Sequence, residues 1–484
     1  MNMLVVFPEI VMALGSLGLL LYSAWRGAKG TRLVGWMAMG LMAFVASLVC
    51  QSAGQGVGLN GMAVSDGLRC FVKVLLLGAS AIVFMATFQR DPETTPDHSI
   101  MLLFAILGMM VMISAHNLIT LYMGLELQNL ALYVLVASRR EDIKSSEAGV
   151  KYFALSALSS GILLFGLSLL YGFAGTMDFG ALAKAFGGAT DEHALGLTVG
   201  TMFVLAGFAF KVSVFPFQMW TPDVYEGAPT PVTAFMATAP KLAAFSVLTL
   251  LCLQPLSQIG QAIGFVFAVM SVASMAVGAF GGLRQTSFKR LMGYSAIVNM
   301  GTLMVALAVL GTPAIDVVAR IEATQSILLY MTLYILGTLG IFSILFILEQ
   351  GPNRFTDIPD MAGLSQTNPY LAAAMAVCLF SLSGVPPLAG FFGKYFVFLG
   401  AVRAGWIALA VLGVFCSVVA AAYYLRVIKI MYFELAPDSR RSHEVAWPQA
   451  LLIAGICGAL VLFIFLPSPF LEEARQAVES LVGP

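Results

Sequence analysis

The sequence predicts an all-α polytopic membrane protein, and three observations lead to this fold class. Of its 484 residues, 60% are hydrophobic and only 10% are charged. Its mean hydropathy of +0.92 leaves too few polar residues to cover the surface of a water-soluble domain. The apolar residues also gather in runs of about 20, the length that a helix needs to cross the hydrocarbon core. Lipid is therefore the expected solvent.

The apolar runs divide the chain into about 14 expected transmembrane helices. Their cores lie at residues 4–25, 33–51, 69–88, 99–115, 117–137, 148–173, 196–220, 230–253, 260–281, 288–310, 323–348, 370–399, 405–432 and 448–466. The first run has the apolar character of a signal peptide, but it lacks a basic segment and is long enough to span, so we expect a retained helix. Residues 1–484 are expected to form a single integral membrane domain.

The basic residues of the expected loops predict the orientation of the chain. Loops after odd-numbered helices hold 15 of them and the other loops hold 4. The larger group is Arg26, Lys29, Arg32, Arg90, Arg139, Arg140, Lys144, Arg284, Lys289, Arg290, Arg354, Arg426, Lys429, Arg440 and Arg441, and the smaller is Lys184, Arg320, Arg403 and Arg475. Arg69 and Lys73, at the start of the third helix, are ambiguous. Because Lys and Arg collect on the cytoplasmic side, both termini are predicted to lie on the opposite side.

Five charged residues cannot be assigned to a loop: Glu126, Lys151, Lys211, Lys241 and Lys394. A charge at mid-membrane costs about 2.5 to 3.5 kcal/mol on insertion scales, so it indicates a function. For Glu126, in LYMGLELQNLALYVL, the simpler alternative is a protonated side chain hydrogen-bonded to a neighbouring helix. The buried lysines favour an ion pair instead, because pairing is the usual way to make such a charge tolerable.

Two of these lysines lie beside predicted helix breaks. Two prolines follow Lys211 in AGFAFKVSVFPFQMWTPDVYEGAPTP, and two precede Lys394 in SLSGVPPLAGFFGKYFVF. Proline removes a backbone donor and clashes with the preceding turn, so helices 7 and 12 are expected to be broken. The same feature in both halves of the chain is typical of a transporter built from repeats. We expect two inverted five-helix repeats, helices 4–8 at residues 99–253 and helices 9–13 at residues 260–432.

The buried lysines suit a proton relay for a physical reason. Burial makes a lysine easier to deprotonate, whereas a nearby carboxylate holds its proton, so moving Glu126 relative to Lys211 would bind or release a proton. Lys241 stands near the middle of helix 8, where a lysine cannot easily reach the membrane surface. Lys151 follows Glu147 by four residues, so a surface pair on one helical face is its simpler interpretation.

Four further polar residues, Ser295, Asn299, Tyr330 and Tyr334, lie in the expected helices of the second half. They would be able to support water between the lysines, although helix packing explains each one alone.

Other chemistries find no support in the sequence. The 6 cysteines show no CxxC spacing and the 4 histidines no paired-ligand spacing, so metal, haem and iron–sulfur sites are not expected. The segment ending in Gly393 and Lys394 fails as a phosphate loop, because Leu388 replaces the first glycine and Tyr395 replaces Ser or Thr. The balanced charge argues against nucleic acid as a partner.

The charged residues and the phrase FPFQMWTPDVYEGAPTPVTAF resemble the antiporter-like membrane subunits of respiratory complex I, a proton-translocating NADH:quinone oxidoreductase. The similarity extends over nearly the whole chain. The length, the 14 expected helices, Lys394 where a sister subunit has a glutamate, and the lack of a long C-terminal lateral helix favour one subunit type within the family.

The resemblance implies a role for each charged residue. Glu126 and Lys211 would be the coupling pair, Lys241 the central relay and Lys394 the terminal donor toward the periplasm. Glu147 and Lys151 match positions that tune Lys211. A charge change arriving from a neighbouring subunit would drive a proton along these lysines.

The resemblance also implies a setting: a multi-pass protein of the bacterial inner membrane with periplasmic termini. Its partners would be sister antiporter-like subunits, small membrane subunits and the lipid bilayer. This chain would carry no redox centre or cofactor, and NADH, FMN, iron–sulfur clusters and quinone would belong to partner subunits. Two alternatives stay open. One is a subunit of a multisubunit cation/proton antiporter or membrane-bound hydrogenase, and the other is a scaffold whose buried charges only fix helix packing.

Overall fold

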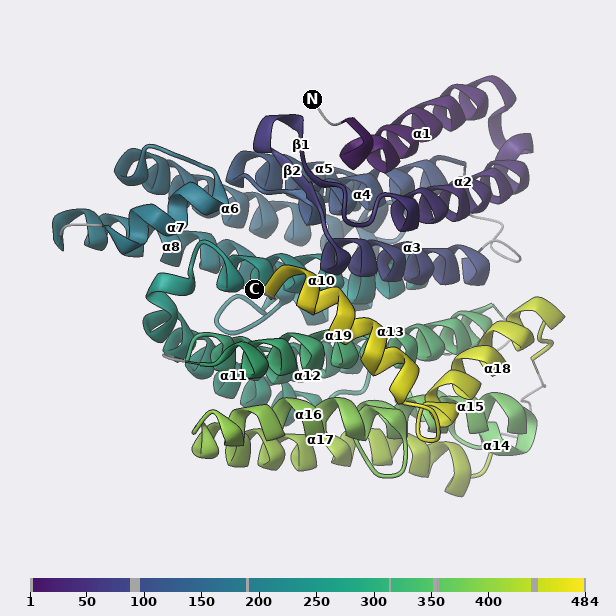
Figure 1. The fold of residues 1–484 in the computed structure, drawn as a ribbon. Helices are drawn as coiled ribbons and strands as arrows, with labels where there is room; N and C mark the ends of the chain where they lie inside the picture. Colours follow the sequence, from purple (N-terminus) through teal and green to yellow (C-terminus); the bar gives the residue numbers. More distant parts are fainter. Residues whose placement is uncertain are drawn as a thin grey trace.

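The fold is that of a computed structural model, which describes residues 3–87, 96–188, 191–312, 315–350, 355, 357–436 and 443–482. Their helices lie side by side, as Figure 1 shows, with the N-terminal helices at one edge and α16 and α17 at the other. Twelve helices in this part of the chain are long and apolar enough to cross a membrane, and α15 and α18 are shorter apolar helices. The all-α polytopic fold class is confirmed.

Three helices and a hairpin form the N-terminal part. They are α1 (Phe7–Arg26), α2 (Thr31–Gln51), β1 (Gly56–Gly58), β2 (Ala63–Ser65) and α3 (Gly67–Thr87). The two strands pair antiparallel, with Gly56 opposite Ser65. The sequence analysis did not predict this hairpin.

The first half of the remaining chain comprises α4 (Pro96–Ser114), α5 (Leu118–Val136), α6 (Ile143–Ala174), α7 (Phe179–Gly187), α8 (Asp191–Val212), α9 (Trp220–Gly227) and α10 (Thr230–Leu253). The second half comprises α11 (Gly260–Gly282), α12 (Phe288–Leu310), α13 (Val317–Glu349), α14 (Leu364–Thr367), α15 (Pro369–Ser383), α16 (Ala389–Arg403), α17 (Ile407–Phe433), α18 (Trp447–Leu462) and α19 (Ser468–Val482). Each expected range overlaps one helix or a broken pair. The inverted repeats stay a prediction.

Two helices begin earlier than the hydropathy predicts, because each has a capping residue. The side chain of Asp142 accepts a hydrogen bond from the backbone of Lys144, so α6 starts about one turn before the apolar run. Asp316 caps α13 in the same way. Lys144 and Arg320 therefore lie in helices, and their placement in loops was wrong.

Several other residues counted as loop charges also lie in helices, namely Arg26, Arg32, Lys184, Lys289, Arg290, Arg403, Arg426, Lys429 and Arg475. Arg90, Arg354, Arg440 and Arg441 lie outside the described residues. The orientation of the termini stays a prediction.

Both predicted helix breaks are present. The first separates α8 from α9 and the second separates α15 from α16. Protein groups satisfy the backbone at the first break: the indole of Trp220 donates to the carbonyl of Phe210 at 3.0 Å, and the amide of Phe215 donates to Ser274 Oγ at 2.8 Å. At the second break, the amide of Gly390 donates to Ser381 Oγ at 3.2 Å. Irregular backbone at membrane depth needs such protein partners.

The two halves meet at three central helices. In the most apolar stretch of each helix, 94% of the residues are buried in α10, 94% in α12 and 89% in α13. The corresponding share is 39% in α1 and in α17. Figure 1 shows α10 and α13 in the middle of the molecule, with α19 lying across them. The buried charge on α10, that of Lys241, therefore lies where the halves touch.

A close approach at the second break gives a first prediction. A Cβ added at Gly390 would lie 1.8 Å from the carbonyl oxygen of Ser381, so Gly390→Ala must separate the two half-helices. Overpacking of this kind costs about 1–3 kcal/mol or more, and we expect less assembled protein and a lower thermal unfolding temperature in detergent. The control is Gly400→Ala on the same helix, where a Cβ meets nothing within 4 Å. Equal stability of the two variants would contradict this account of the break.

Candidate proton-transfer site

Glu126 lies on α5 with its side chain partly buried. Its Oε1 accepts a hydrogen bond from the hydroxyl of Ser160 on α6 and a second, of 3.3 Å, from Nδ2 of Asn129. These polar partners compensate for part of the cost of placing a carboxyl group in an apolar helix.

Lys211 lies in the last turn of α8, and 5% of it is exposed. Its Nζ donates to Oδ1 of Asn129 and, at 3.2 Å, to the hydroxyl of Tyr152. Asn129 therefore hydrogen-bonds both to Glu126, through its amide nitrogen, and to Lys211, through its amide oxygen. The expected pair is bridged by one residue instead of being in direct contact.

The sequence analysis missed Asn129, although a signal was present. Asn129 follows Glu126 by three residues in ELQN, so the two side chains share one face of α5. A carboxamide that both donates and accepts is suited to join a carboxylate to an ammonium.

Lys241 is 1% exposed in the middle of α10. Its Nζ donates to Oγ of Ser213 at 3.2 Å and lies 5.7 Å from the ring centre of Tyr225. Ser213 is the first residue after α8, two positions beyond Lys211, and has a φ of 65°. The first break thus presents a hydroxyl to Lys241 directly beyond the helix end that carries Lys211.

Lys394 is 7% exposed on α16, and its Nζ donates to the carbonyl oxygen of Ser383 at the end of α15, at 2.9 Å. It borders a cavity of about 10 Å³ that is also lined by Asn299, Tyr330 and Tyr334. A polar space of that size is near the minimum for one water molecule. The second break therefore holds a buried lysine in the same way as the first.

The polar residues noted in the second half form a connected group beside Lys394. The hydroxyl of Tyr330 donates to Oδ1 of Asn299 at 2.7 Å, and Nδ2 of Asn299 donates to the carbonyl oxygen of Ser295 at 2.8 Å. The hydroxyls of Ser295 and Tyr424 lie 2.5 Å apart. No side chain of the described residues hydrogen-bonds to both Lys241 and Lys394, so a proton would need water to pass between them.

Glu147 and Lys151 belong to a surface network of six charged side chains. Lys151 Nζ lies 2.7 Å from Glu147 and 2.9 Å from Asp223, and Arg290 Nη1 lies 2.7 Å from Asp223. Arg290 and Lys144 also pair with Glu226, each at 3.2 Å. Together they line an open pocket of about 140 Å³. The expected pair is present, but the acids of the DVYEG segment, which complete the network, were not predicted as part of it.

Asp223 is the centre of this network. Burial raises the pKa of its carboxyl group, but the hydrogen bond from Lys151 and the charge of Arg290 outweigh burial and hold the pKa below its usual value. Lys151 does not hydrogen-bond to Lys211, whereas its chain neighbour Tyr152 does. Any influence of Lys151 on Lys211 would have to pass through α6 or through the electrostatic field.

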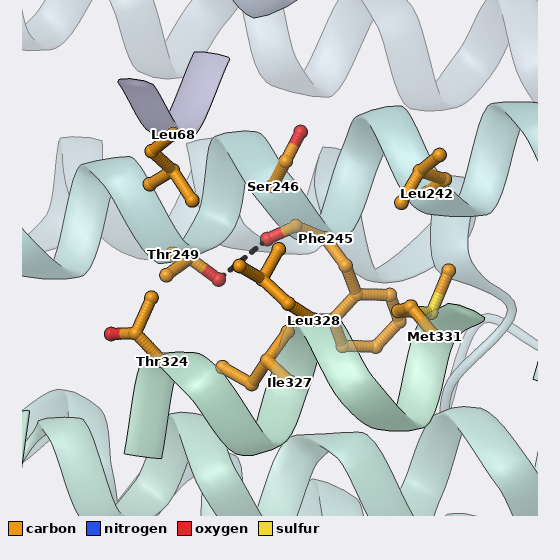
Figure 2. A pocket seen from close by; sticks show the side chains of 9 residues that line it. All are labelled: Leu68, Leu242, Phe245, Ser246, Thr249, Thr324, Ile327, Leu328 and Met331. Atoms are coloured by element: carbon orange, nitrogen blue, oxygen red, sulfur yellow. Dashed lines mark hydrogen bonds between the residues drawn. The ribbon is translucent and has the colours of Figure 1, made fainter. Parts of the chain in front are cut away.

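On the far side of Lys241 from this network, α10 is packed by apolar side chains. Figure 2 shows Leu68 of α3, Leu242 and Phe245 of α10, and Leu328 and Met331 of α13 around a cavity of about 10 Å³. The hydroxyl of Thr249 beside it donates to the carbonyl oxygen of Phe245 at 2.8 Å. Ser246 and Thr324 also line it, so the mainly apolar wall of the cavity carries hydroxyl groups as well.

No group of three or more His, Cys, Asp or Glu side chains that could hold a metal ion occurs in the part of the chain that the structure describes.

Comparisons with known proteins identify relatives over nearly the full length. The family model described as "NADH:quinone oxidoreductase/Mrp antiporter, TM" matches residues 115–420. The NADH-quinone oxidoreductase subunit N of Rhodospirillum rubrum is 44% identical, with 98% of this chain and 96% of that protein covered. The subunit N of Parvibaculum lavamentivorans is 43% identical, with coverages of 98% and 97%.

Solved structures agree with this similarity. A chain of respiratory complex I from Thermus thermophilus is 28% identical, with a TM-score of 0.81 and coverages of 96% of this chain and 99% of that chain. A chain of the Mrp complex from a Dietzia species shares the fold with a TM-score of 0.87, coverages of 100% and 98%, and 18% identity. A chain of an archaeal membrane-bound sulfane sulfur reductase has a TM-score of 0.84, coverages of 99% and 97%, and 20% identity.

Proposed function

Because the chain belongs to the NADH:quinone oxidoreductase/Mrp antiporter family of membrane subunits, among its subunit N members, we propose that it translocates protons through a relay of Glu126, Lys211, Lys241 and Lys394. The subunit type is the one expected from the length and from Lys394. The observation that carries the proposal is the bridge from Glu126 through Asn129 to Lys211.

The bridge supports a switch between two charge arrangements. Asn129 holds the carboxylate and the ammonium near each other without a direct ion pair, so a small movement of α5 or α8 changes the field at Lys211 without breaking a salt bridge. Interactions between charges are strong in a low dielectric, so such a movement shifts the proton affinity of a buried lysine substantially.

The next step is transfer to Lys241 and then to Lys394. Ser213 places a hydroxyl between the end of α8 and Lys241, and the group around Asn299 and Tyr330 offers hydroxyls beside Lys394. Beyond Lys241, the packing around Phe245 and Leu328 is mainly apolar, so it offers a proton fewer partners than the group around Asn299 does. The proton would therefore move toward the second half. The inverted repeats, residues 99–253 and 260–432, would supply one broken helix for each step.

The charged pocket around Asp223 is proposed as the place of proton uptake, with Glu147 and Lys151 tuning the field near Lys211. The proposed orientation puts this pocket at the cytoplasmic side and both termini at the periplasmic side of the bacterial inner membrane. NADH, FMN, iron–sulfur clusters and quinone are proposed to reside in partner subunits, so this chain is a non-redox subunit of the enzyme. Sister antiporter-like subunits and small membrane subunits are the proposed neighbours.

The identities favour the redox complex over a cation/proton antiporter. Among the solved structures, the chain is 28% identical to a chain of respiratory complex I but 18% identical to the Mrp complex chain. We expect detergent purification of a tagged chain from its native membrane to yield flavin and iron–sulfur subunits and NADH:quinone activity. Mass identification of the copurified subunits checks the assembly. Recovery of a complex without redox subunits, together with cation/proton exchange in vesicles, would reject this assignment.

A further inference from the structure

We propose that Glu9 and Lys73 form a second proton-binding site, separate from the relay. Glu9 lies in the first turn of α1, and Lys73 lies in the second turn of α3. Lys73 Nζ is 2.6 Å from Oε1 of Glu9, and the exposed fractions of the two side chains are 1% for Lys73 and 7% for Glu9. The relay uses neither residue. A buried titratable pair of this kind in a membrane protein is a functional candidate by default.

One oxygen of Glu9 is available to bind a proton. Oε1 accepts from Lys73 and, at 2.6 Å, from the hydroxyl of Ser114 at the end of α4. Oε2 is buried and has no hydrogen-bond partner. A buried charged acceptor without a partner costs about 1–3 kcal/mol or more. A proton at Oε2 forms one O–H bond and neutralises the carboxylate. Lys73 then remains an ammonium hydrogen-bonded to Oε1 without a counter-charge, so the proton is held weakly and is readily released.

Three further titratable side chains lie near the end of α4, where Ser114 contacts Glu9, and they are increasingly exposed. The exposed fractions rise from 12% for Asp66 to 21% for His116 and 39% for Asp178. Nε2 of His116 lies 3.8 Å from Oδ2 of Asp178. Arg69, which pairs with Asp66, donates to the carbonyls on either side of Ser114, those of Ile113 at 3.1 Å and Ala115 at 3.2 Å. We call Asp66, His116 and Asp178 the release path.

His116 is suited to accept a proton on this path. Burial lowers the pKa of its imidazole and the Arg69 cation lowers it further, against the carboxylates of Asp178 and Asp66. The lowered pKa means that a proton on the ring is passed on easily, and Nδ1 is buried without a hydrogen-bond partner among the described residues. The other titratable group beside the pair is the thiol of Cys70, whose Sγ lies 3.3 Å from Oγ of Ser65.

The release path opens at the opposite end of the molecule from the charged pocket around Asp223. Lys144 and Lys151, which line that pocket, lie in the first turns of α6, whereas Asp178 follows the other end of the same helix. The proposed orientation makes this the periplasmic side, where protons are released.

Leu68, which precedes Arg69, lines a small cavity with Phe245 of α10 and Leu328 of α13, as Figure 2 shows. No hydrogen bond or ion pair of the described residues joins Glu9 or Lys73 to Lys241. The competing explanation is a permanently ionised clamp that ties α1 and α3 to the end of α4.

The experiment is an infrared pH titration of the resting, intact complex, which does not depend on proton pumping. We expect the wild type to show the carbonyl band of a protonated carboxyl group that appears as the pH falls. The band should shift in Glu9→Asp and be lost in Glu9→Gln. The control is Glu322→Gln, which changes a carboxylate paired with Arg403 at 2.7 Å on the exposed surface and should leave the band unchanged.

The possible results distinguish a proton-binding site from a permanently ionised clamp and from a cation site. If neither the wild type nor Glu9→Asp shows a Glu9-dependent band at any pH at which the complex is intact, the pair is a permanently ionised clamp. A band that responds to sodium at constant pH would identify a cation site. If Glu9→Gln does not assemble, the double variant Glu9→Gln/Lys73→Gln, which leaves no unpaired charge, supplies the missing spectrum. In Lys211→Ala the band should persist, so failure of the relay proposal would be recognised separately.

Discussion

Lys211→Ala is expected to leave the membrane complex assembled and to slow proton translocation on the order of 10²-fold, the lower end of what a positioned proton-transfer group contributes. The physical reason is that the variant removes the ammonium that the bridge through Asn129 links to Glu126. The measurement is the rate of proton uptake into vesicles containing the purified complex, divided by the rate of NADH oxidation. Undiminished pumping by an intact complex would contradict the assignment of Lys211 to the relay.

Lys211→Arg distinguishes the relay from a scaffold. Arginine keeps the positive charge and the ability to hydrogen-bond to Asn129 and Tyr152, but its guanidinium does not lose a proton in proteins. If the charge only fixes helix packing, Lys211→Arg restores the function that Lys211→Ala loses. If Lys211 binds and releases a proton, both variants are impaired. Lys184→Ala, at an exposed lysine on α7, is the control for removal of a lysine without a role in transfer.

The features that could be predicted from the sequence are those with local causes. Apolar run length fixed the expected helices, and prolines near Lys211 and Lys394 located both breaks. The helix starts at Ile143 and Val317 were placed too late, because hydropathy does not register the capping aspartates that extend a helix beyond its apolar part.

Contacts between distant segments could not be predicted in the same way. Glu226 and Arg290 pair although 64 positions separate them, and Lys73 reaches Glu9 from another helix. Hydropathy assigns such residues to a surface or a helix end, and only the packing of helices shows what they contact. Lys73 was ambiguous in the sequence because it lies at the start of the third expected helix, and its partner Glu9 is distant in the chain.

Asn129→Asp is expected to block the switch even though Lys211 is retained. Asn129 is 1% exposed, and its Oδ1 accepts directly from Lys211 Nζ, so an aspartate there places a permanent carboxylate against the ammonium. At an effective dielectric constant of about 20, such a contact is worth about 4 kcal/mol. Since about 1.4 kcal/mol corresponds to a factor of ten, Lys211 would hold its proton about 10³-fold more tightly.

Proton translocation per NADH in vesicles should then fall to the level of Lys211→Ala, while the complex stays assembled. Asn117→Asp is the matched control on the same helix. Asn117 caps α5 through its side-chain oxygen, which accepts from the amide of Ile119 at 2.8 Å, and aspartate caps a helix equally well. Normal pumping by Asn129→Asp would mean that a carboxylate next to Lys211 does not control its proton, and Glu126 would then lose its role as the other half of a switch. Loss of pumping in Asn129→Asp but not in Asn117→Asp would instead indicate that the electric field at Lys211 controls the coupling.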